Sequence, residues 1–464
     1  MTADAPPTGA AAGAGAGARA GTEIGDEVGD RVRARGASAR TSRWALLDSL
    51  TVRNYRLFAG GQVVSLVGTW MQLTALDWLV VDLGGGGDAL GVAVGLQFLP
   101  TPVFGLYAGL LADRTDKRRL LLATQSTAGL LAAGLCALVA SGHVTLAVLF
   151  VFAALLGTVN AFDTPTRQAF VSELVGVERV PNAIAINSIT FNSARVVGPA
   201  VGGLLLAAVG SRSGAATVFG ANAASYLAVL AGLARMRVRE LYPARRLARA
   251  KGQLRAGVRY AAGSPVIAGA MALVAVVGTL GMNFPVTLTL MARRTFHGGA
   301  ATYGTLTALV AVGGIVGAVF TARRRSAPRP RTLIASAAVF GLGETVGAAM
   351  PNVWAFGAVL IPTGAALLVF TTSANATVQL ATDAGMRGRV MAVYILVLLG
   401  TTPLGAPTVG AVADWLGPRA GLALGGLGSL AAAAAGVTLS TVLGWFRARS
   451  ESVAGAGPAG RADT

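Results

Sequence analysis

Long apolar segments, each bounded by a short polar segment, follow one another along almost the whole of this 464-residue chain. A bilayer core about 30 Å thick needs roughly 20 apolar residues in each helix that crosses it. Segments of that length lie near residues 57–82, 88–112, 119–140, 144–163, 183–209, 215–235, 265–291, 300–322, 332–350, 353–382, 388–413 and 418–444. The pattern therefore predicts an all-α membrane protein with twelve transmembrane helices.

A polar and basic segment divides the predicted helices into two groups of six, and the two groups are related in sequence. The run from Gly198 to Gly203 in the fifth helix aligns with the run from Ala406 to Ala411 in the eleventh, and the same offset of 208 places Gly109 on Gly317. Two parallel six-helix repeats around a central cavity are a known transporter plan. We expect a disordered cytoplasmic tail at 1–52, a six-helix bundle at 53–235 and a basic cytoplasmic linker at 236–264. A second six-helix bundle at 265–445 and a cytoplasmic tail at 446–464 complete the chain.

The basic residues predict the orientation of the chain, because short positively charged loops stay on the cytoplasmic side. With a cytoplasmic N-terminus, 33 of the 38 Lys and Arg residues lie in cytoplasmic segments. Arg195 lies inside a helix, and the four that fall outside are Arg212, Arg293, Arg294 and Arg419. Only Lys117 and Lys251 are lysines, which favours a GC-rich bacterial genome. We expect a multi-pass protein of the bacterial inner membrane with both termini in the cytoplasm.

Composition argues against several other classes of protein. Hydrophobic residues make up 54% of the chain and charged residues 12%, which is more apolar than a soluble domain. The net charge of +18 is spread over short segments and not over one face, so nucleic-acid binding is not expected. Cys136 is the single cysteine, so neither an intramolecular disulfide nor a thiolate metal site is available.

No chemistry of the enzyme type is indicated. A phosphate loop ends in Gly-Lys-Ser or Gly-Lys-Thr, but Lys117 precedes Arg118 and Lys251 precedes Gly252. The two histidines, His143 and His297, fall in opposite halves of the chain, so a clustered metal site is not expected. We therefore expect neither a cofactor nor a resident metal, and not an enzyme.

The segment after the second predicted helix, 109–119, reads Gly-Leu-Leu-Ala-Asp-Arg-Thr-Asp-Lys-Arg-Arg. It resembles the signature loop of the major facilitator superfamily, with Asp116 where glycine is usual. The resemblance implies a conformational switch built on Gly109, Asp113, Arg114 and Arg118. Gly109 would allow close contact with the other half, and Asp113 would lie near a helix N-terminus or a partner arginine. Each arginine taken alone fits a topology determinant equally well.

The fifth predicted helix carries Gly198, Pro199, Gly202 and Gly203, similar to the second half of a motif of antiporters in this superfamily. Ala185 and Ala194 replace the two upstream glycines of that motif, so the match is partial. Proline bends a spanning helix, and we expect the glycines to let it pack tightly against a helix of the other half. Ordinary helix packing is the alternative explanation.

A longer run strengthens the resemblance. Asn160 to Pro165, Arg167-Gln168, Pro181 to Ala183 and Arg195 to Pro199 look like the enterobactin-exporter and macrolide-efflux branch. The resemblance covers roughly residues 50–445. It implies proton-driven export of an amphipathic small molecule, such as a drug, an antibiotic or a siderophore, by a monomer whose partners are substrate, protons and lipid. The alternative is a proton-coupled importer or a uniporter of a small metabolite.

Charged side chains inside predicted helices mark further candidates, because a charge at a bilayer centre costs roughly 2.5–3.5 kcal/mol. Arg195 has two interpretations. It ties its helix to nearby carbonyl or polar groups, or it has a functional role, binding an anionic group or modulating a proton carrier. Antiport needs a group that binds a proton in one state and releases it in another. We expect Asp77 to carry the proton, with Glu344 as second choice. A carboxylate at the outer interface beside Trp78 is the competing interpretation of Asp77.

Uncharged polar side chains on helices expected to line the cavity are candidates for substrate contacts. They are Gln72, Gln97, Asn187, Asn192, Asn283 and Tyr394. A multisubstrate pocket would combine them with aromatic side chains such as Trp70 and Phe98. Each of them alone is more often a hydrogen-bonding residue in helix packing.

Overall fold

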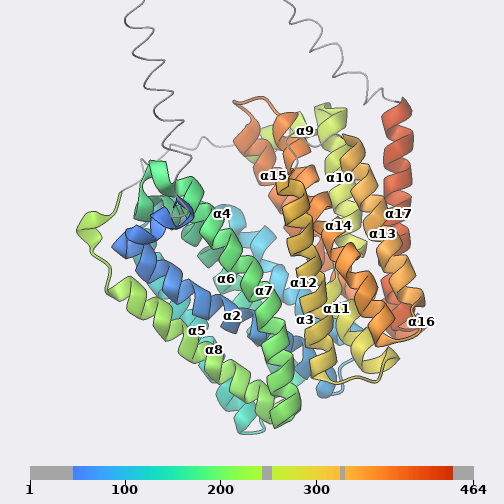
Figure 1. The fold of residues 1–464 in the computed structure, drawn as a ribbon, viewed down its shortest axis with the longest axis horizontal. Helices are drawn as coiled ribbons and strands as arrows, with labels where there is room; N and C mark the ends of the chain where they lie inside the picture. Colours follow the sequence, from blue (N-terminus) through green and yellow to red (C-terminus); the bar gives the residue numbers. More distant parts are fainter. Residues whose placement is uncertain (1–44, 243–252, 324–329, 443–464) are drawn as a thin grey trace, which may run out of the picture.

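The structure, a computed structural model, describes residues 45–242, 253–323 and 330–442 (Figure 1). Every regular element in these ranges is a helix. The first half of the chain forms η1 (Ala45–Thr51), α2 (Arg53–Asp82), α3 (Gly87–Phe98), α4 (Pro100–Arg114), α5 (Lys117–Ala140), α6 (Leu146–Val175), η2 (Val177–Arg179), α7 (Val180–Val209), α8 (Ser211–Ala234) and η3 (Val238–Glu240). The second half forms α9 (Gln253–Gly263), α10 (Pro265–Leu280), α11 (Phe284–Leu290), η4 (Met291–Thr295), α12 (Ala300–Arg323), α13 (Pro330–Ala349), α14 (Val353–Leu380), α15 (Arg387–Gly400), α16 (Thr402–Leu416) and α17 (Pro418–Val442).

The described helices confirm the prediction of an all-α membrane protein. Eleven of them, some counted across a short break, are long and apolar enough to cross a bilayer. The helical stretches Gly87–Gly105 and Tyr107–Arg114 form a bent pair with 58° between them, and as one span they raise the number to twelve. Their bounds lie within a few residues of the predicted ones, with one exception.

The exception is the fourth predicted helix, which we expected to end at residue 163. Instead α6 continues to Val175, with Pro165 inside it. The polar residues that suggested an end are compatible with a helix because Asp163 and Arg167 lie one turn apart. Arg167 Nε lies 3.4 Å from Asp163 Oδ2, so the two charges compensate each other within the span.

The structure describes helices within the predicted N-terminal tail and within the predicted linker. The 3-10 helix η1 lies within the tail predicted at 1–52 and packs against the start of α7, where Ser49 N donates to Asn182 Oδ1 at 3.0 Å. Within the linker predicted at 236–264, η3 and α9 are helical. The rest of the tails and linker falls at 1–44, 243–252 and 443–464, outside the described residues.

The helices form two bundles, α2–α8 and α10–α17, here called the N half and the C half. In the N half α2 packs against α7 and α8, and in the C half α13 packs against α14 and α17. Both described chain ends lie at the same end of the molecule, the upper one in Figure 1. We call this the terminal end and the opposite one the far end.

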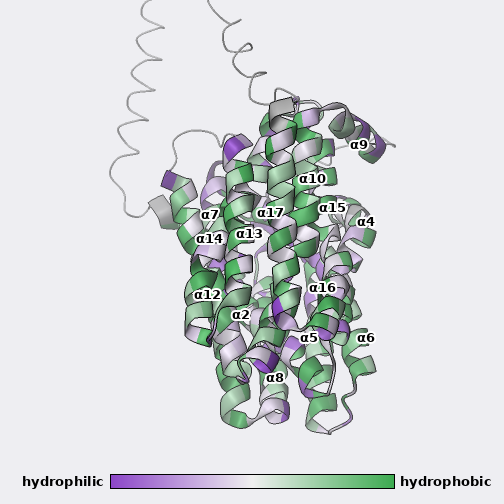
Figure 2. Cartoon of the chain, turned by 90° about the vertical axis from the view of Figure 1, so that its right-hand side faces the viewer, coloured by the Kyte–Doolittle hydropathy of each residue, from purple (hydrophilic) through white to green (hydrophobic). Residues whose placement is uncertain are grey.

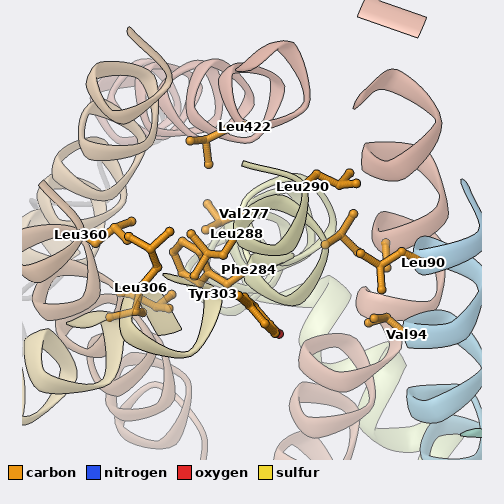
Figure 3. Close-up of a cluster of buried hydrophobic side chains, with 14 of the residues drawn as sticks. Leu90, Val94, Val277, Phe284, Leu288, Leu290, Tyr303, Leu306, Leu360 and Leu422 are labelled. Atoms are coloured by element: carbon orange, nitrogen blue, oxygen red, sulfur yellow. The ribbon is translucent and has the colours of Figure 1, made fainter. Parts of the chain in front are cut away.

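The two halves meet through close helix contacts toward the far end. A Cβ atom at Gly203 of α7 would lie 3.1 Å from the Cα of Gly304 in α12, and one at Gly91 of α3 would lie 2.7 Å from the Cα of Pro407 in α16. Only residues without a side chain allow helix backbones to approach this closely. Figure 3 shows buried apolar side chains of the same core, with Leu90 and Val94 of α3 on the side of the N half and Leu290 of α11 and Leu306 of α12 on the side of the C half.

The outer surface is apolar along most of its length. Figure 2 shows mainly hydrophobic colouring on the outer helices, and several of the hydrophilic patches lie near helix ends. Large apolar side chains point outward, among them Leu130, Trp354 and Trp415, which are 74%, 83% and 85% exposed. Such a surface is stable in lipid and not in water.

Candidate functional site

A buried hydrogen bond joins the halves near the far end. Asp77 of α2 is 4% exposed, and Tyr303 of α12 donates its hydroxyl to Asp77 Oδ2 at 2.8 Å. In Figure 3 the Tyr303 hydroxyl points away from the neighbouring apolar side chains. The structure therefore places Asp77 in the contact between the halves and not at the outer interface. Any separation of the halves at this end must break this bond.

Asp414, at the end of α16, makes a second polar contact between the halves. Its carboxylate accepts the backbone N–H groups of Gly87 and Asp88, both at 2.8 Å, at the first turn of α3. A carboxylate at a helix N-terminus satisfies free donors and interacts favourably with the helix dipole. Arg294 also donates to Asp414, at 2.5 Å. We call the Asp77–Tyr303 and Asp414–α3 contacts together the far-end closure.

Sequence reasoning missed the role of Asp414, because the predicted eleventh helix ended one residue before it. The sequence did contain a signal for it. Asp414 is an acidic residue at the outer end of the predicted eleventh helix, and that helix is the internal repeat of the glycine-rich fifth helix. Arg293 contributes nearby, since its guanidinium carbon lies 5.4 Å from the centroid of the Trp78 ring in the N half.

The glycines of the fifth-helix motif serve both halves. A Cβ at Gly202 would lie 3.2 Å from the Met71 Cα, and Gly198 packs on the same helix, α2. Gly203 instead faces α12. The Pro199 carbonyl faces the same helix and approaches Gly304. The expectation of packing against the other half is therefore correct for one side of the motif only, because the other side packs within the N half.

Arg195 lies on α7 two turns before Gly203, on the terminal side of the contact between the halves. Its guanidinium carbon lies 5.8 Å from the centroid of the Trp70 ring, and Trp70 in turn makes an edge contact with Phe191, with centroids 5.7 Å apart. Arg195 has no ion pair with any described carboxylate. Asn187 and Asn192 are partly exposed on the same helix, and Asn192 donates to the Ser188 carbonyl. The cluster of Trp70, Phe191 and Arg195, here the α7 cluster, presents a cation and two aromatic rings.

Three of the residues predicted to contact substrate are buried, and their hydrogen bonds described here stay within one half. Gln72 is 3% exposed and accepts Asn222 Nδ2 of α8 at 2.8 Å, which is helix packing. Tyr394 donates to the Thr371 carbonyl at 3.3 Å inside the C half. Asn283 is fully buried at the break between α10 and α11 and donates to the Thr279 carbonyl at 2.7 Å. Gln97, near the end of α3, is partly exposed and adjoins Gly157 of α6.

Glu344 lies apart from Asp77, inside the C half. It is 2% exposed on α13, and a Cβ atom at Gly281 or at Gly425 would lie 2.9 Å from its Oε2. That oxygen has no hydrogen-bond partner among the described residues. The two predicted proton carriers therefore belong to different environments, and Asp77 is the one that joins the halves.

Residues 109–119 form the end of α4, the two-residue turn at Thr115 and Asp116 and the first turn of α5, at the terminal end. Asp116, where the family has glycine, has extended backbone geometry and accepts the Arg119 N–H at 3.0 Å as the N-cap of α5. The turn therefore needs no glycine there. Arg118 donates from Nε to the Leu233 carbonyl at 2.7 Å, at the end of α8. Gly109 and Asp113 are partly exposed and Arg114 is exposed.

Sequence reasoning also missed two buried ionisable groups of the N half. Lys117, one of the basic residues counted toward the orientation of the chain, is 8% exposed, and its Nζ lies 2.6 Å from Glu173 Oε1 of α6. Asp163, the last residue of the predicted fourth helix, is 3% exposed and accepts hydrogen bonds from Thr124 and Gln125 of α5. The run from Asn160 to Arg167 was a signal for it, since two opposite charges there stand four residues apart.

Residues 41–450 match the transmembrane secretion effector family. The chain is 27% identical over 372 residues to the enterobactin exporter EntS of Shigella flexneri, covering 77% of this chain and 82% of that protein. It is 31% identical over 153 residues to the staphyloferrin A transporter of Staphylococcus aureus, which is 33% of this chain and 38% of that protein.

Solved structures with the same fold include the nucleoside transporter NupG, with a TM-score of 0.63 and 12% identity over 85% of this chain and 99% of that one. A bacterial homologue of the iron transporter ferroportin in an inward-facing state has a TM-score of 0.66 and 14% identity over 84% of this chain and 98% of that one.

Proposed function

The chain belongs to the transmembrane secretion effector family of the major facilitator superfamily, and from this premise we propose that it exports an anionic, amphipathic small molecule across the bacterial inner membrane in exchange for protons. Two halves that rock about a site between them would perform the export by alternating access. Both termini are cytoplasmic in this proposal, as the distribution of basic residues predicts.

The single observation that carries the mechanism is the asymmetry of the contact between the halves. The far-end closure and the glycine contacts Gly203–Gly304 and Gly91–Pro407 lie toward one end. With cytoplasmic termini, the far end is the outer end, so the proposed state is open to the cytoplasm. Export then requires the halves to separate at the far end and close at the terminal end.

The α7 cluster supports the choice of substrate. The half-buried guanidinium of Arg195 has no carboxylate partner among the described residues, which is costly in a membrane, and an anionic substrate would supply the missing charge. Trp70 and Phe191 add aromatic faces that suit a planar or apolar part of the same molecule. Relatives named for enterobactin and staphyloferrin A point to siderophores as the first compounds to test.

Asp77 is the proposed proton-coupling residue, because its carboxylate takes part in the contact that must open. Protonation would change the acceptor of the Tyr303 bond, so the charge of this one group would bias the balance between the closed and open far end. A ligand can shift such a balance only by its differential affinity for the two states, and here the proton is that ligand.

The test uses inverted vesicles with an imposed pH gradient, acidic inside. Anionic siderophores and anionic aromatic dyes are compared with cationic amphipathic drugs. We expect saturable, gradient-dependent accumulation of the anionic compounds. In Arg195→Ala the KM for them should rise about tenfold or more, because a hydrogen bond to a charged group contributes roughly 1.5–3 kcal/mol.

The matched control for Arg195→Ala is Arg212→Ala, which removes an exposed arginine at the far end of α8. Accumulation in right-side-out vesicles only would indicate import, the alternative direction. A preference for cationic compounds, or equal effects of the two arginine variants, would refute the assignment of the α7 cluster.

A further inference from the structure

The short helix α9 lies at the terminal end of the C half, just before the spanning helix α10 (Figures 1 and 2). One side of α9 packs on this half. Ala261 is 4% exposed, and a Cβ atom at Gly257 would lie 2.7 Å from the carbonyl oxygen of Arg389 in α15. The Tyr260 hydroxyl accepts the backbone N–H of Asp383 at 3.2 Å. These contacts hold α9 against the C half and leave its opposite side uncovered.

The uncovered side of α9 is basic with an apolar border. Arg255, Val258 and Arg259 are all exposed there, and the two arginines lie one turn apart on one face of the helix. Neither arginine has an ion pair or a hydrogen bond with any described residue. Val258 beside them is 49% exposed. We call these three residues the α9 face.

The corresponding element of the N half lacks such a face. The offset of 208 between the halves places the start of α9 on η1, where Leu47 and Thr51 stand in place of the two arginines. The charge on η1 has a partner, because Asp48 Oδ2 lies 2.9 Å from Nε of Arg179. The repeated fold therefore does not itself require two unpaired arginines at this position.

We propose that the α9 face binds the phosphate groups of anionic phospholipids in the cytoplasmic leaflet. A planar guanidinium group can donate two parallel hydrogen bonds to a phosphate. An amphipathic helix with basic and apolar side chains suits the boundary between head groups and acyl chains, where Val258 would lie at the apolar side. Lipid bound here would tie the start of α15 to the membrane surface. The inference rests on the proposed cytoplasmic position of the terminal end.

The sequence around α9 favours a membrane surface as the partner. Six Lys and Arg residues and no acidic residue fall between positions 245 and 259, and α10 begins at Pro265. Four to eight basic residues directly beside a spanning helix are typical of segments that bind anionic lipid. A leaflet presents many phosphate groups at once, which matches this density of positive charge.

The test is lipid binding by the purified full-length protein, followed by native mass spectrometry during titration with phosphatidylglycerol. Each arginine near an anionic surface contributes about 1 kcal/mol, which is a factor of about five in affinity. The double variant Arg255→Gln/Arg259→Gln should therefore bind phosphatidylglycerol about 30-fold more weakly. Its binding of zwitterionic phosphatidylcholine should not change.

The matched control is Arg119→Gln/Arg237→Gln, which removes two exposed arginines from the terminal end of the N half. These arginines already have carboxylate partners, Asp116 at 3.8 Å and Glu240 at 3.0 Å. The control should bind phosphatidylglycerol as the unaltered protein does. Equal losses in the two double variants would overturn the proposal, because any positive charge at this end would then serve. Displacement of phosphatidylglycerol by inorganic phosphate would also overturn it, since the site would then bind a free anion.

A second measurement places the α9 face relative to the bilayer. A spin label at Val258→Cys, with Cys136 replaced by serine, should be more accessible to oxygen dissolved in the lipid than to a water-soluble nickel reagent in nanodiscs. The reverse result would mean that water or another protein segment covers the face, and would overturn the proposal. Neither measurement needs a transport substrate. Binding of phosphatidylglycerol at α9 by a protein without gradient-driven export would refute the export proposal and retain the lipid site.

Discussion

The hydrogen bond between Tyr303 and Asp77 gives the sharpest prediction, for the variant Tyr303→Phe. In the observed state the substitution leaves a buried carboxylate oxygen without its donor, since Asp77 is 4% exposed. In a state open at the far end, water would satisfy the same oxygen. The substitution therefore destabilises only the state in which the far end is closed.

A hydrogen bond to a charged group contributes about 1.5–3 kcal/mol, so the balance should move toward the open far end by roughly 10-fold to 150-fold. The assay is pulsed electron resonance on spin labels at His143→Cys and Pro351→Cys, in far-end loops of the N half and the C half. Cys136 is replaced by serine so that only the two intended sites react. We expect a longer inter-label distance to gain population in Tyr303→Phe.

Tyr394→Phe is the matched control. It removes a hydroxyl from an equally buried tyrosine whose bond to Thr371 stays inside the C half. Its distance distribution should resemble that of the unaltered protein. If the two tyrosine variants give the same distribution, the Tyr303 bond does not hold the far end closed, and the argument from the far-end closure fails.

Three further predictions concern coupling, the terminal-end loop and topology. Asp77→Asn should abolish efflux driven by a pH gradient in inverted vesicles, because an amide cannot carry a proton between states; full activity of both Asp77→Asn and Glu344→Gln would mean that the proton travels by another group or with the substrate. Asp113→Asn should cripple transport with normal membrane insertion, measured by uptake and by the amount of protein in the membrane, and normal uptake by the inserted variant would contradict a switch role. Cysteine-accessibility labelling should find residue 250 on the cytoplasmic side and residue 298 outside, and the reverse pattern would refute the orientation from charge.

The sequence alone determined the class of fold. A bilayer demands about 20 apolar residues per crossing and satisfied backbone groups, so the length and spacing of apolar segments are strongly constrained. This is why the predicted spans agree with the described helices within a few residues. The prediction failed at the end of α6, where polar residues suggested that the helix stops. Arg167, one turn further along the same helix, pairs with Asp163, so both charges are tolerated inside the span.

Only the tertiary structure decided what each polar residue contacts, because a spanning helix can present a given side chain to lipid, to its own bundle or to the other half. Gln72 and Tyr394 were candidates for substrate contact and are bound inside their own halves. Asp77 was identified from sequence, but its partner Tyr303 lies 226 residues away and enters through the packing of α2 near α12. Asp414 acquires its role only because the N-terminus of α3 meets the end of α16. Apolar length is a local property of the chain, whereas the rotation of each helix about its axis follows from the close packing of all its neighbours.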